Sequence, residues 1–149
     1  MNDFEKNLND ILVETFNTIL KYEESALKTI ASIPLTVAEA HMLEAIQKNG
    51  GVTTISDLAA RLAITLPTTT VAVKKLEKKG FVMKAPSSSD GRSFVVSLTD
   101  LGKRVDRAHS LFHQRMVKSI SREFDEGQQE VLITAIEKLN TFFKEKAGM

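Results

Sequence analysis

The chain has 149 residues, 42% of them hydrophobic and 26% charged, and a formal net charge of +1, which fits one ordinary domain with a sizeable core. No apolar run approaches the ~18 residues of a membrane span, and the N-terminus lacks the apolar segment of a signal peptide, so we expect a cytoplasmic protein with no membrane partner. The absence of cysteine excludes disulfides, thiolate metal sites and thiol-based redox sensing.

Helical periodicity dominates the N-terminal part of the chain. Apolar residues recur at three- and four-residue spacing over residues 3–30, which predicts one long amphipathic helix. Thr36 and Glu39 then form a capping-box pattern, in which each side chain can satisfy the free backbone N–H of the other residue. A second helix should therefore run from Thr36 to about Lys48.

Two short helices are predicted in the middle of the chain. The first follows Thr54 and extends to about Leu62. The second begins after Thr65 and has Pro67 in its first turn, where the missing N–H costs nothing. Gly80 ends it.

A β-hairpin follows these helices. Residues 81–85 and 93–98 are apolar-rich and contain β-branched and aromatic side chains, and the polar segment PSSSDGR separates them. Two further helices are expected beyond the hairpin, over residues 99–122 and 125–146. The fold class is therefore mainly α with one small β-hairpin.

The positive charge is concentrated in one central segment. Residues 1–60 hold 4 basic and 9 acidic side chains, residues 61–92 hold 7 and 2, and residues 93–149 hold 9 and 8. Clustered Lys and Arg create a local field that attracts polyanions, so this segment indicates a nucleic-acid partner. The alternative is a basic helix face that is only solvated.

Two short helices joined by a tight turn, the second of them basic and followed directly by a hairpin, are the parts of a winged helix-turn-helix. The segments ISDLAARLAI, VKKLEKKGFV, DGR and VSLTDLG, in this order, resemble the MarR family of transcriptional regulators over the whole length of the chain. The resemblance implies a single domain over residues 1–149, with a DNA-binding core at 36–98 and dimerisation helices at 1–32 and 99–149.

Side chains that can reach DNA lie on the second of the two short helices. Hydroxyls and methyls in its N-terminal turns can meet base edges, and lysines one turn later can meet phosphates. The candidate DNA-binding residues of this helix are Pro67, Thr68, Thr70, Val71, Lys74 and Lys75. Val73, Leu76 and Thr69 should turn inward, and Lys78 and Lys79 either contact phosphates or are only solvated.

The wing adds three more candidate DNA-binding residues. By resemblance to the D-x-R pattern of the family, Arg92 is expected to enter the minor groove and Asp90 to fix its side chain. Gly91 departs from the family, many members of which carry a second Arg there, and this lowers the charge of the wing. Ser88 and its serine neighbours either donate to phosphates or only form the turn.

A DNA reader of this size usually binds a palindrome as a two-fold dimer. The final helix carries more apolar surface than a three-helix core and a hairpin can bury, at Val131, Leu132, Ala135, Ile136, Leu139, Phe142 and Phe143. With the first helix, it is expected to form the interface of an intertwined homodimer. Burial against the preceding helix of the same chain is the alternative.

Three histidines and one glutamate form a candidate metal site. His109 and His113 are four residues apart and share a helix face, as two ligands of one metal must. His41 lies on the second helix, and Glu23 lies on the apolar stripe of the first, where an unpaired carboxylate would be costly. In the resemblance, these four positions match the ligands of zinc-sensing members of the family. The acidic residues expected beside His41 and before His109 for a second metal site are alanines here.

The effector has two other candidates. The runs ILKYEESAL, LTVAEAHMLEAI and HSLFHQRMV are similar to the branch of the family that represses fatty-acid synthesis genes with an acyl-carrier protein as corepressor. In that branch, the histidines pack or hydrogen-bond and are not taken as metal ligands. A small apolar ligand in the dimer cleft is the third candidate.

These patterns predict a homodimeric, sequence-specific DNA-binding regulator, most simply a repressor, whose affinity for a palindromic operator is controlled by an effector. One alternative is a zinc-responsive regulator, and another is a winged helix used only for protein contact. Four protein ligands would leave no open position for water on a zinc ion, and no other set of catalytic groups is visible, so no enzymatic activity is expected.

Overall fold

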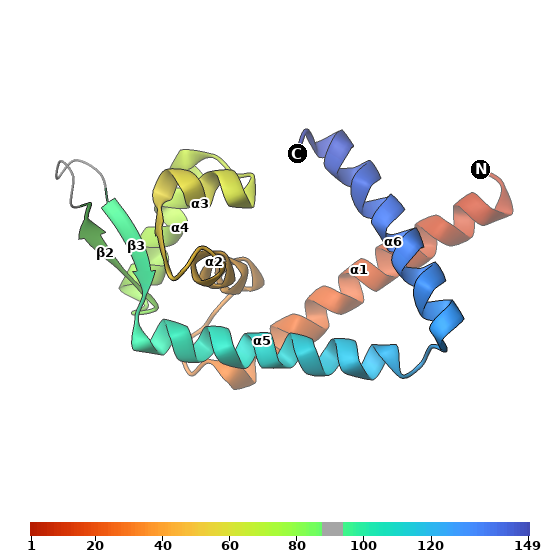
Figure 1. Cartoon of the computed structure of the whole chain (residues 1–149), viewed down its shortest axis with the longest axis horizontal. Helices are drawn as coiled ribbons and strands as arrows, with labels where there is room; N and C mark the ends of the chain where they lie inside the picture. Colours follow the sequence, from red (N-terminus) through yellow and green to blue (C-terminus); the bar gives the residue numbers. More distant parts are fainter. Residues whose placement is uncertain (88–93) are drawn as a thin grey trace. The chain divides into compact units, whose positions relative to one another are not determined.

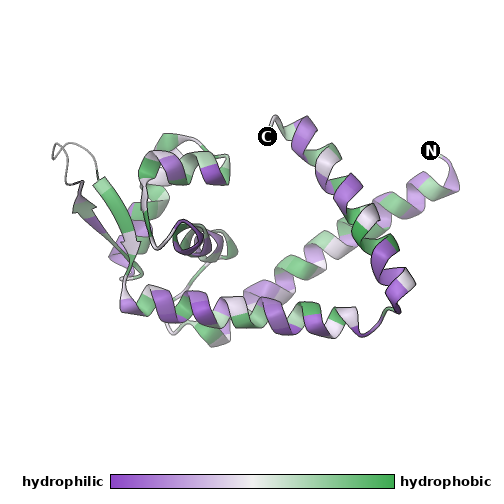
Figure 2. Ribbon diagram, viewed as in Figure 1, coloured by the Kyte–Doolittle hydropathy of each residue, from purple (hydrophilic) through white to green (hydrophobic). Residues whose placement is uncertain are grey.

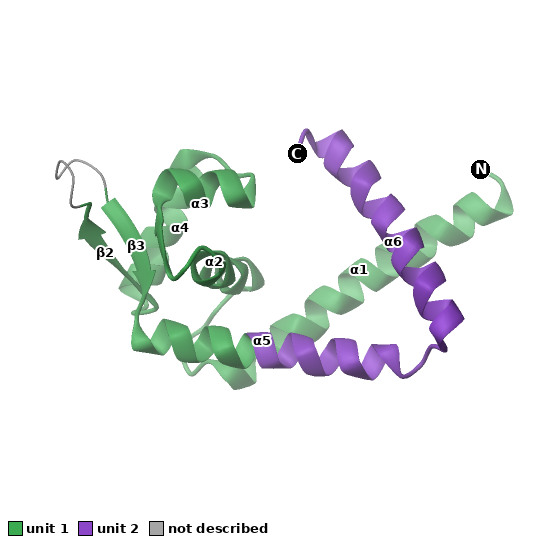
Figure 3. Cartoon of the chain, in the orientation of Figure 1, with its two compact units in different colours: residues 1–109 green, residues 110–149 purple. Residues whose placement is uncertain are grey.

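Helices flanking one small sheet make up the fold. The structure, a computed structural model, describes residues 1–87 and 94–149, and these contain the elements labelled in Figure 1. In chain order they are α1 (Asp3–Ile30), α2 (Val37–Lys48), β1 (Val52–Thr54), α3 (Ile55–Leu62), α4 (Leu66–Lys78), β2 (Val82–Pro86), β3 (Phe94–Leu98), α5 (Asp100–Ser121) and α6 (Glu126–Ala147). The chain divides into two compact units, Met1–His109 and Ser110–Met149, with the boundary inside α5 (Figure 3).

The predicted fold class is confirmed, and every predicted helix is present with ends within about two residues of those expected. Local signals account for this agreement, and at α2 and α6 the signal is a capping box. The Thr36 hydroxyl accepts from the Glu39 backbone N–H at 3.1 Å, and the Thr36 N–H donates to the Glu39 carboxylate at 2.9 Å. Asp125 and Gln128 do the same at the start of α6. A third capping box at α1, formed by Asn2 and Glu5, was not predicted.

The sheet has three antiparallel strands in the order β1-β3-β2. β2 and β3 form the predicted hairpin, in a register that pairs Val82 with Leu98 and Ala85 with Val95. The strand β1, which was not predicted, pairs with the other edge of β3. Three residues are too few to show an alternating pattern, so this strand is defined by the unpaired backbone groups that β3 offers.

The core lies in the first unit, between the sheet and the short helices. Fully buried side chains come from α2 (Leu43, Ile46), α3 (Leu58), α4 (Val73, Leu76), β3 (Val96) and the connection at Phe81. Burial of each large apolar side chain contributes roughly 1.5–3 kcal/mol to folding. Because α4 supplies two of these side chains, its orientation is set by the core itself.

The long helices at the two ends of the chain contrast with this core. Among the residues of α1, only Glu23 and Leu27 are buried, and no residue of α6 is buried. Hydrophobic residues nevertheless recur along both helices (Figure 2), and Phe4, Phe16, Val131, Phe142 and Phe143 are all more than half exposed. No helix within the described residues is long and apolar enough to cross a membrane.

Close packing fixes the start of α5 against the end of α4. The Thr99 hydroxyl donates to the Gly80 carbonyl at 2.6 Å and accepts from the Gly102 N–H at 3.1 Å. Gly102 lies so close to Phe81 that a Cβ atom at this position would overlap the Phe81 carbonyl oxygen. That oxygen also accepts a hydrogen bond from the Thr99 N–H. Only glycine therefore fits at position 102.

Replacing Gly102 by alanine should lower the free energy of unfolding by about 1–3 kcal/mol, because the new Cβ must displace backbone atoms. Chemical denaturation at fixed protein concentration measures this change. The matched control is Gly127→Ala in the first turn of α6, where a Cβ would meet only the Asp125 side chain at 3.4 Å. Alanine there should be neutral or stabilise by roughly 0.5–1 kcal/mol. Equal stability of the two variants would show that the packing around Gly102 relaxes without cost.

Candidate nucleic-acid interface

The turn between α3 and α4 sets the position of the candidate DNA-contacting helix. Ala63 reverses the chain in a left-handed backbone conformation (φ 52°, ψ 42°). Thr65 then caps α4, since its hydroxyl oxygen accepts from the Thr68 N–H at 3.3 Å. Pro67 lies in the first turn, as predicted. The result is a helix-turn-helix with a well-defined N-terminus of α4.

One face of α4 is anchored in the core. Thr69, Val73 and Leu76 are fully buried, which confirms the prediction that these three side chains turn inward. The Thr69 hydroxyl is satisfied because it donates to the Thr65 carbonyl at 2.9 Å. With this face fixed, the opposite face of α4 is held outward.

The outward face of α4 carries the predicted DNA-binding residues. Pro67, Thr68, Val71, Lys74 and Lys75 are exposed, and Thr70 is half-buried. Helical spacing arranges five of them in two adjacent rows, Pro67–Val71–Lys75 and Thr70–Lys74, with apolar and hydroxyl groups toward the N-terminus and lysines toward the C-terminus. Their contact with DNA stays a prediction.

The first turn of α4 has no acidic side chain to balance the positive end of the helix dipole. Each of the other five helices has an acidic residue in its first turn, whereas α4 has none. An acidic side chain at this end of a helix neutralises the partial positive charge of the free backbone N–H groups. Without one, the first turn of α4 remains favourable for an anion such as a DNA phosphate.

A hollow of about 480 Å³ lies between this outward face and the start of α2. Its walls include Pro67, Val71 and Lys75 from α4, and Thr36 and Ala38 from the start of α2. The hollow therefore places the predicted DNA-binding residues next to a second helix N-terminus of the same unit.

Lys79 has a role that the sequence did not indicate. Its ammonium group donates to both oxygens of the Glu39 carboxylate at 2.8 and 2.9 Å and to the Pro34 carbonyl at 2.9 Å. Lys79 thus ties the end of α4 to the start of α2. Lys78, the other lysine whose role was left open from the sequence, is exposed. In the sequence, Glu39 was assigned only to the capping box with Thr36, whereas in the structure it also pairs with Lys79.

The electrostatics of Glu39 follow from this contact. Burial by itself raises the pKa of Glu39, but the hydrogen bonds from Lys79 and Thr36 and the charge of Lys79 outweigh it and lower the pKa below the ordinary 4.5. The carboxylate is therefore ionised at neutral pH and holds α2 against α4.

The candidate DNA-binding residues of the wing, Ser88, Asp90 and Arg92, lie outside the described residues. The strands β2 and β3 flank this segment in the chain, and Pro86 is paired with Phe94. The roles of the three residues stay predictions.

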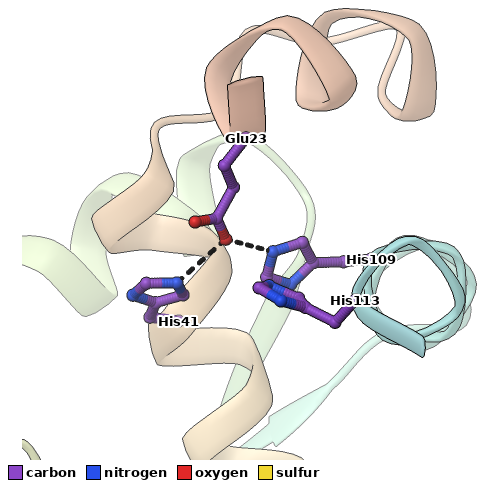
Figure 4. Close-up of side chains that lie close together, drawn as sticks. All are labelled: Glu23, His41, His109 and His113. Carbon is purple, nitrogen blue, oxygen red and sulfur yellow. Dashed lines mark hydrogen bonds and ion pairs between the residues drawn. The ribbon is translucent and has the colours of Figure 1, made fainter. Parts of the chain in front are cut away.

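Glu23, His41 and His109 come together within the first unit, as Figure 4 shows. One oxygen of the buried Glu23 carboxylate lies 2.6 Å from His109 Nε2 and 3.0 Å from His41 Nε2. The cluster joins α1, α2 and α5, and His109 is also buried. His113 follows one helical turn after His109 on α5, at the start of the second unit.

Glu23, His41 and His109 offer the nitrogen and oxygen atoms that zinc accepts, and in this structure both histidines hydrogen-bond to one Glu23 oxygen. No buried side-chain nitrogen or oxygen atom in the described part of the chain lacks a hydrogen-bond partner. Hydrogen bonding alone accounts for this cluster, so the cluster does not by itself favour the zinc alternative.

Comparison with known proteins gives consistent matches. Residues 35–94 match the MarR family. The chain is 34% identical over 84 residues to the uncharacterised HTH-type transcriptional regulator YfiV of Bacillus subtilis, covering 56% of this chain and only 52% of YfiV. It is 25% identical over 133 residues to the transcriptional regulator AdcR of Streptococcus pneumoniae, covering 87% of this chain and 88% of AdcR.

A solved structure matches the chain over nearly its whole length. The crystal structure of Streptococcus pneumoniae FabT in complex with DNA superposes with a TM-score of 0.88 at 28% sequence identity. The match covers 95% of this chain and 98% of that chain. The similarity therefore includes the long terminal helices as well as the helix-turn-helix.

The ion pair between Glu39 and Lys79 should stabilise the fold at neutral pH. Glu39→Gln keeps the capping geometry but removes the charge, so we expect a loss of about 1–2 kcal/mol at pH 7. Because the pKa of Glu39 is lowered in the folded state, the stabilisation is present above pH 4.5 and is lost as the pH falls through the folded pKa. Denaturation curves of both proteins between pH 7 and pH 3 should therefore converge toward low pH.

The matched control is Glu44→Gln on the same helix. Glu44 pairs with Lys48, but this lysine is 65% exposed, so the change should cost well under 1 kcal/mol. An equal loss in both variants would contradict the special role of Glu39.

The Glu23 cluster should also contribute to stability. Glu23→Ala removes the 2.6 Å hydrogen bond between the Glu23 carboxylate and the buried His109 and should lower the free energy of unfolding by about 1–3 kcal/mol. The comparison is made in buffer containing EDTA, so that the hydrogen bonds alone are measured. Glu24→Ala, at an exposed position one residue later, is the control and should change stability by less than about 0.5 kcal/mol. A stable Glu23→Ala variant would refute the structural importance of the cluster.

Proposed function

Since the chain belongs to the MarR family of winged-helix transcriptional regulators, we propose that it binds a palindromic DNA site as a homodimer and represses transcription there. The outward face of α4 carries this proposal, because its polar and basic side chains are held away from a core that buries the opposite face. The similarity over nearly the whole chain to FabT, whose solved structure is a complex with DNA, supports DNA binding by this chain.

In this proposal, α4 enters the major groove. Pro67, Thr68, Thr70 and Val71 meet base edges, and Lys74 and Lys75 meet phosphates. The wing, with Ser88, Asp90 and Arg92, approaches the neighbouring minor groove. The uncompensated N-terminus of α4 adds a favourable field for the phosphate backbone.

Dimerisation is supported by the exposed apolar side chains of the two terminal helices. Phe4 and Phe16 on α1, and Val131 and Phe142 on α6, are each more than half exposed. Apolar surface of this extent on a long helix commonly forms a subunit interface. A two-fold dimer would present two copies of α4 to the two halves of a palindrome.

The same argument weighs against the other functions considered. A winged helix used only for protein contact would not need a row of lysines beside exposed hydroxyls. The relatives named above are regulators, and we propose no catalytic role. We place the regulator in the cytoplasm with its DNA, and we keep an acyl-carrier protein or a small apolar ligand as the candidate effector.

Fluorescence anisotropy with the duplex upstream of the gene for this chain, against a shuffled duplex, tests the proposal. We expect the native duplex to bind more tightly and the logarithm of the affinity to fall linearly with the logarithm of the salt concentration. Lys75→Ala should reduce this salt slope by about one for each phosphate that the lysine no longer neutralises, hence by about two for a dimer.

Lys28→Ala, at an exposed lysine on α1, is the control and should leave the salt slope unchanged. Equal binding of the native and shuffled duplexes, with and without candidate effectors, would refute sequence-specific regulation at this site. A slope that Lys75→Ala does not alter would show that Lys75 does not touch the DNA.

A further inference from the structure

The outward face of α4 lacks the side chains that most often identify bases by paired hydrogen bonds. Adenine is typically recognised by Asn or Gln, and guanine most often by Arg. The helix has the sequence LPTTTVAVKKLEK, which contains no Asn, Gln or Arg, although Lys can also bind guanine. Its lysines all lie in the C-terminal half, beyond the turns that are expected to face the bases. Base recognition by α4 therefore needs another chemical basis.

The threonine hydroxyl groups in the N-terminal turns of α4 already make hydrogen bonds within the helix or to its cap. The Thr70 hydroxyl donates to the Leu66 carbonyl at 2.9 Å, so its hydrogen is not available to a base. Thr68 accepts from the Thr65 hydroxyl at 2.8 Å and keeps its own hydrogen to donate. These turns thus offer fewer hydrogen bonds to a base than their threonine content indicates.

The apolar side chain of Val71, by contrast, is exposed on the outward face of α4. Val71 is 53% exposed and lies in the row Pro67–Val71–Lys75, in the middle of the candidate interface. The next two residues in the chain are a half-buried alanine and the fully buried Val73, so the backbone beneath Val71 is held by the core. An exposed valine on a rigid helix, between a proline and a lysine, presents two methyl groups at a fixed position.

We propose that Val71 is a specificity-determining residue that identifies thymine through contact with its C5-methyl group. This inference rests on the proposed function, since it assumes that α4 enters the major groove. Thymine is the one base that presents a methyl group there, so apolar contact distinguishes a T·A pair from the other pairs without a hydrogen bond. Val71 lines the same hollow as Lys75, which places the methyl contact one helical turn from a phosphate-binding group.

The test compares thymine with uracil, which differs from thymine only by the missing C5-methyl. A duplex selected by the full-length protein from a randomised library is prepared once with thymidine and once with deoxyuridine at every thymine position. Burial of one methyl corresponds to about a fourfold change in affinity. Fluorescence anisotropy should therefore give a decrease in affinity on the order of 10-fold for a two-fold dimer that covers one methyl in each half-site.

Val71→Ala identifies the side chain that makes the contact. This variant should bind the thymine duplex more weakly than the wild-type protein, and it should bind the thymine and uracil duplexes within about twofold of each other. The matched control is Val52→Ala on β1, because Val52 is 50% exposed and the change removes the same two methyl groups. This control should retain the full preference for thymine.

The possible results distinguish a failure of the proposed DNA binding from a failure of the methyl contact alone. Failure to enrich any sequence from the library would refute sequence-specific binding itself. Specific binding of a selected duplex with equal affinity for its uracil form would overturn only the methyl contact. A preference for thymine that Val71→Ala retains, or that Val52→Ala also abolishes, would overturn the assignment to Val71.

Discussion

Burial of one face of α4 is the constraint on which the rest of the candidate interface depends. Thr69, Val73 and Leu76 are fully buried, so the helix cannot rotate without exposing apolar surface and an internally bonded hydroxyl. The direction of Val71 and Lys75 is a consequence of that packing. A reading surface built this way is rigid before any partner binds, which lowers the entropic cost of binding.

Both ends of α4 are tied to other elements by contacts of different kinds. At its N-terminus, the left-handed Ala63 and the Thr65 cap join it to α3. At its C-terminus, Lys79 joins it to Glu39 of α2, and the tight packing of Gly102 against Phe81 joins the following segment to α5. The Glu23 cluster likewise joins helices, since its hydrogen bonds link α1 to α2 and to α5. Hydrogen bonds to the buried carboxyl groups of Glu23 and Glu39 thus lie where helices of the first unit meet.

Most of the fold could be predicted from the sequence because its helix signals are local. Capping pairs such as Thr36 with Glu39 fix helix starts within four residues. The strand β1 and the contact of Lys79 with Glu39 could not be predicted, because both depend on partners about 40 residues away in the chain. The outward residues of α4 followed from helical periodicity, whereas Asp90 and Arg92 were identified by a family pattern rather than by periodicity.

The absence of an acidic residue from the first turn of α4 lowers the stability of this helix but favours the proposed DNA binding. An Asp or Glu at the first turn commonly stabilises a helix by roughly 0.3–1 kcal/mol, and the other five helices use one. An Asp or Glu in the first turn of α4 would place a negative charge on the face that is proposed to meet the negatively charged DNA. Sequence optimisation for thermal stability alone would therefore select against DNA binding at this turn, and a screen for stabilised variants should leave Pro67 and Thr68 unchanged.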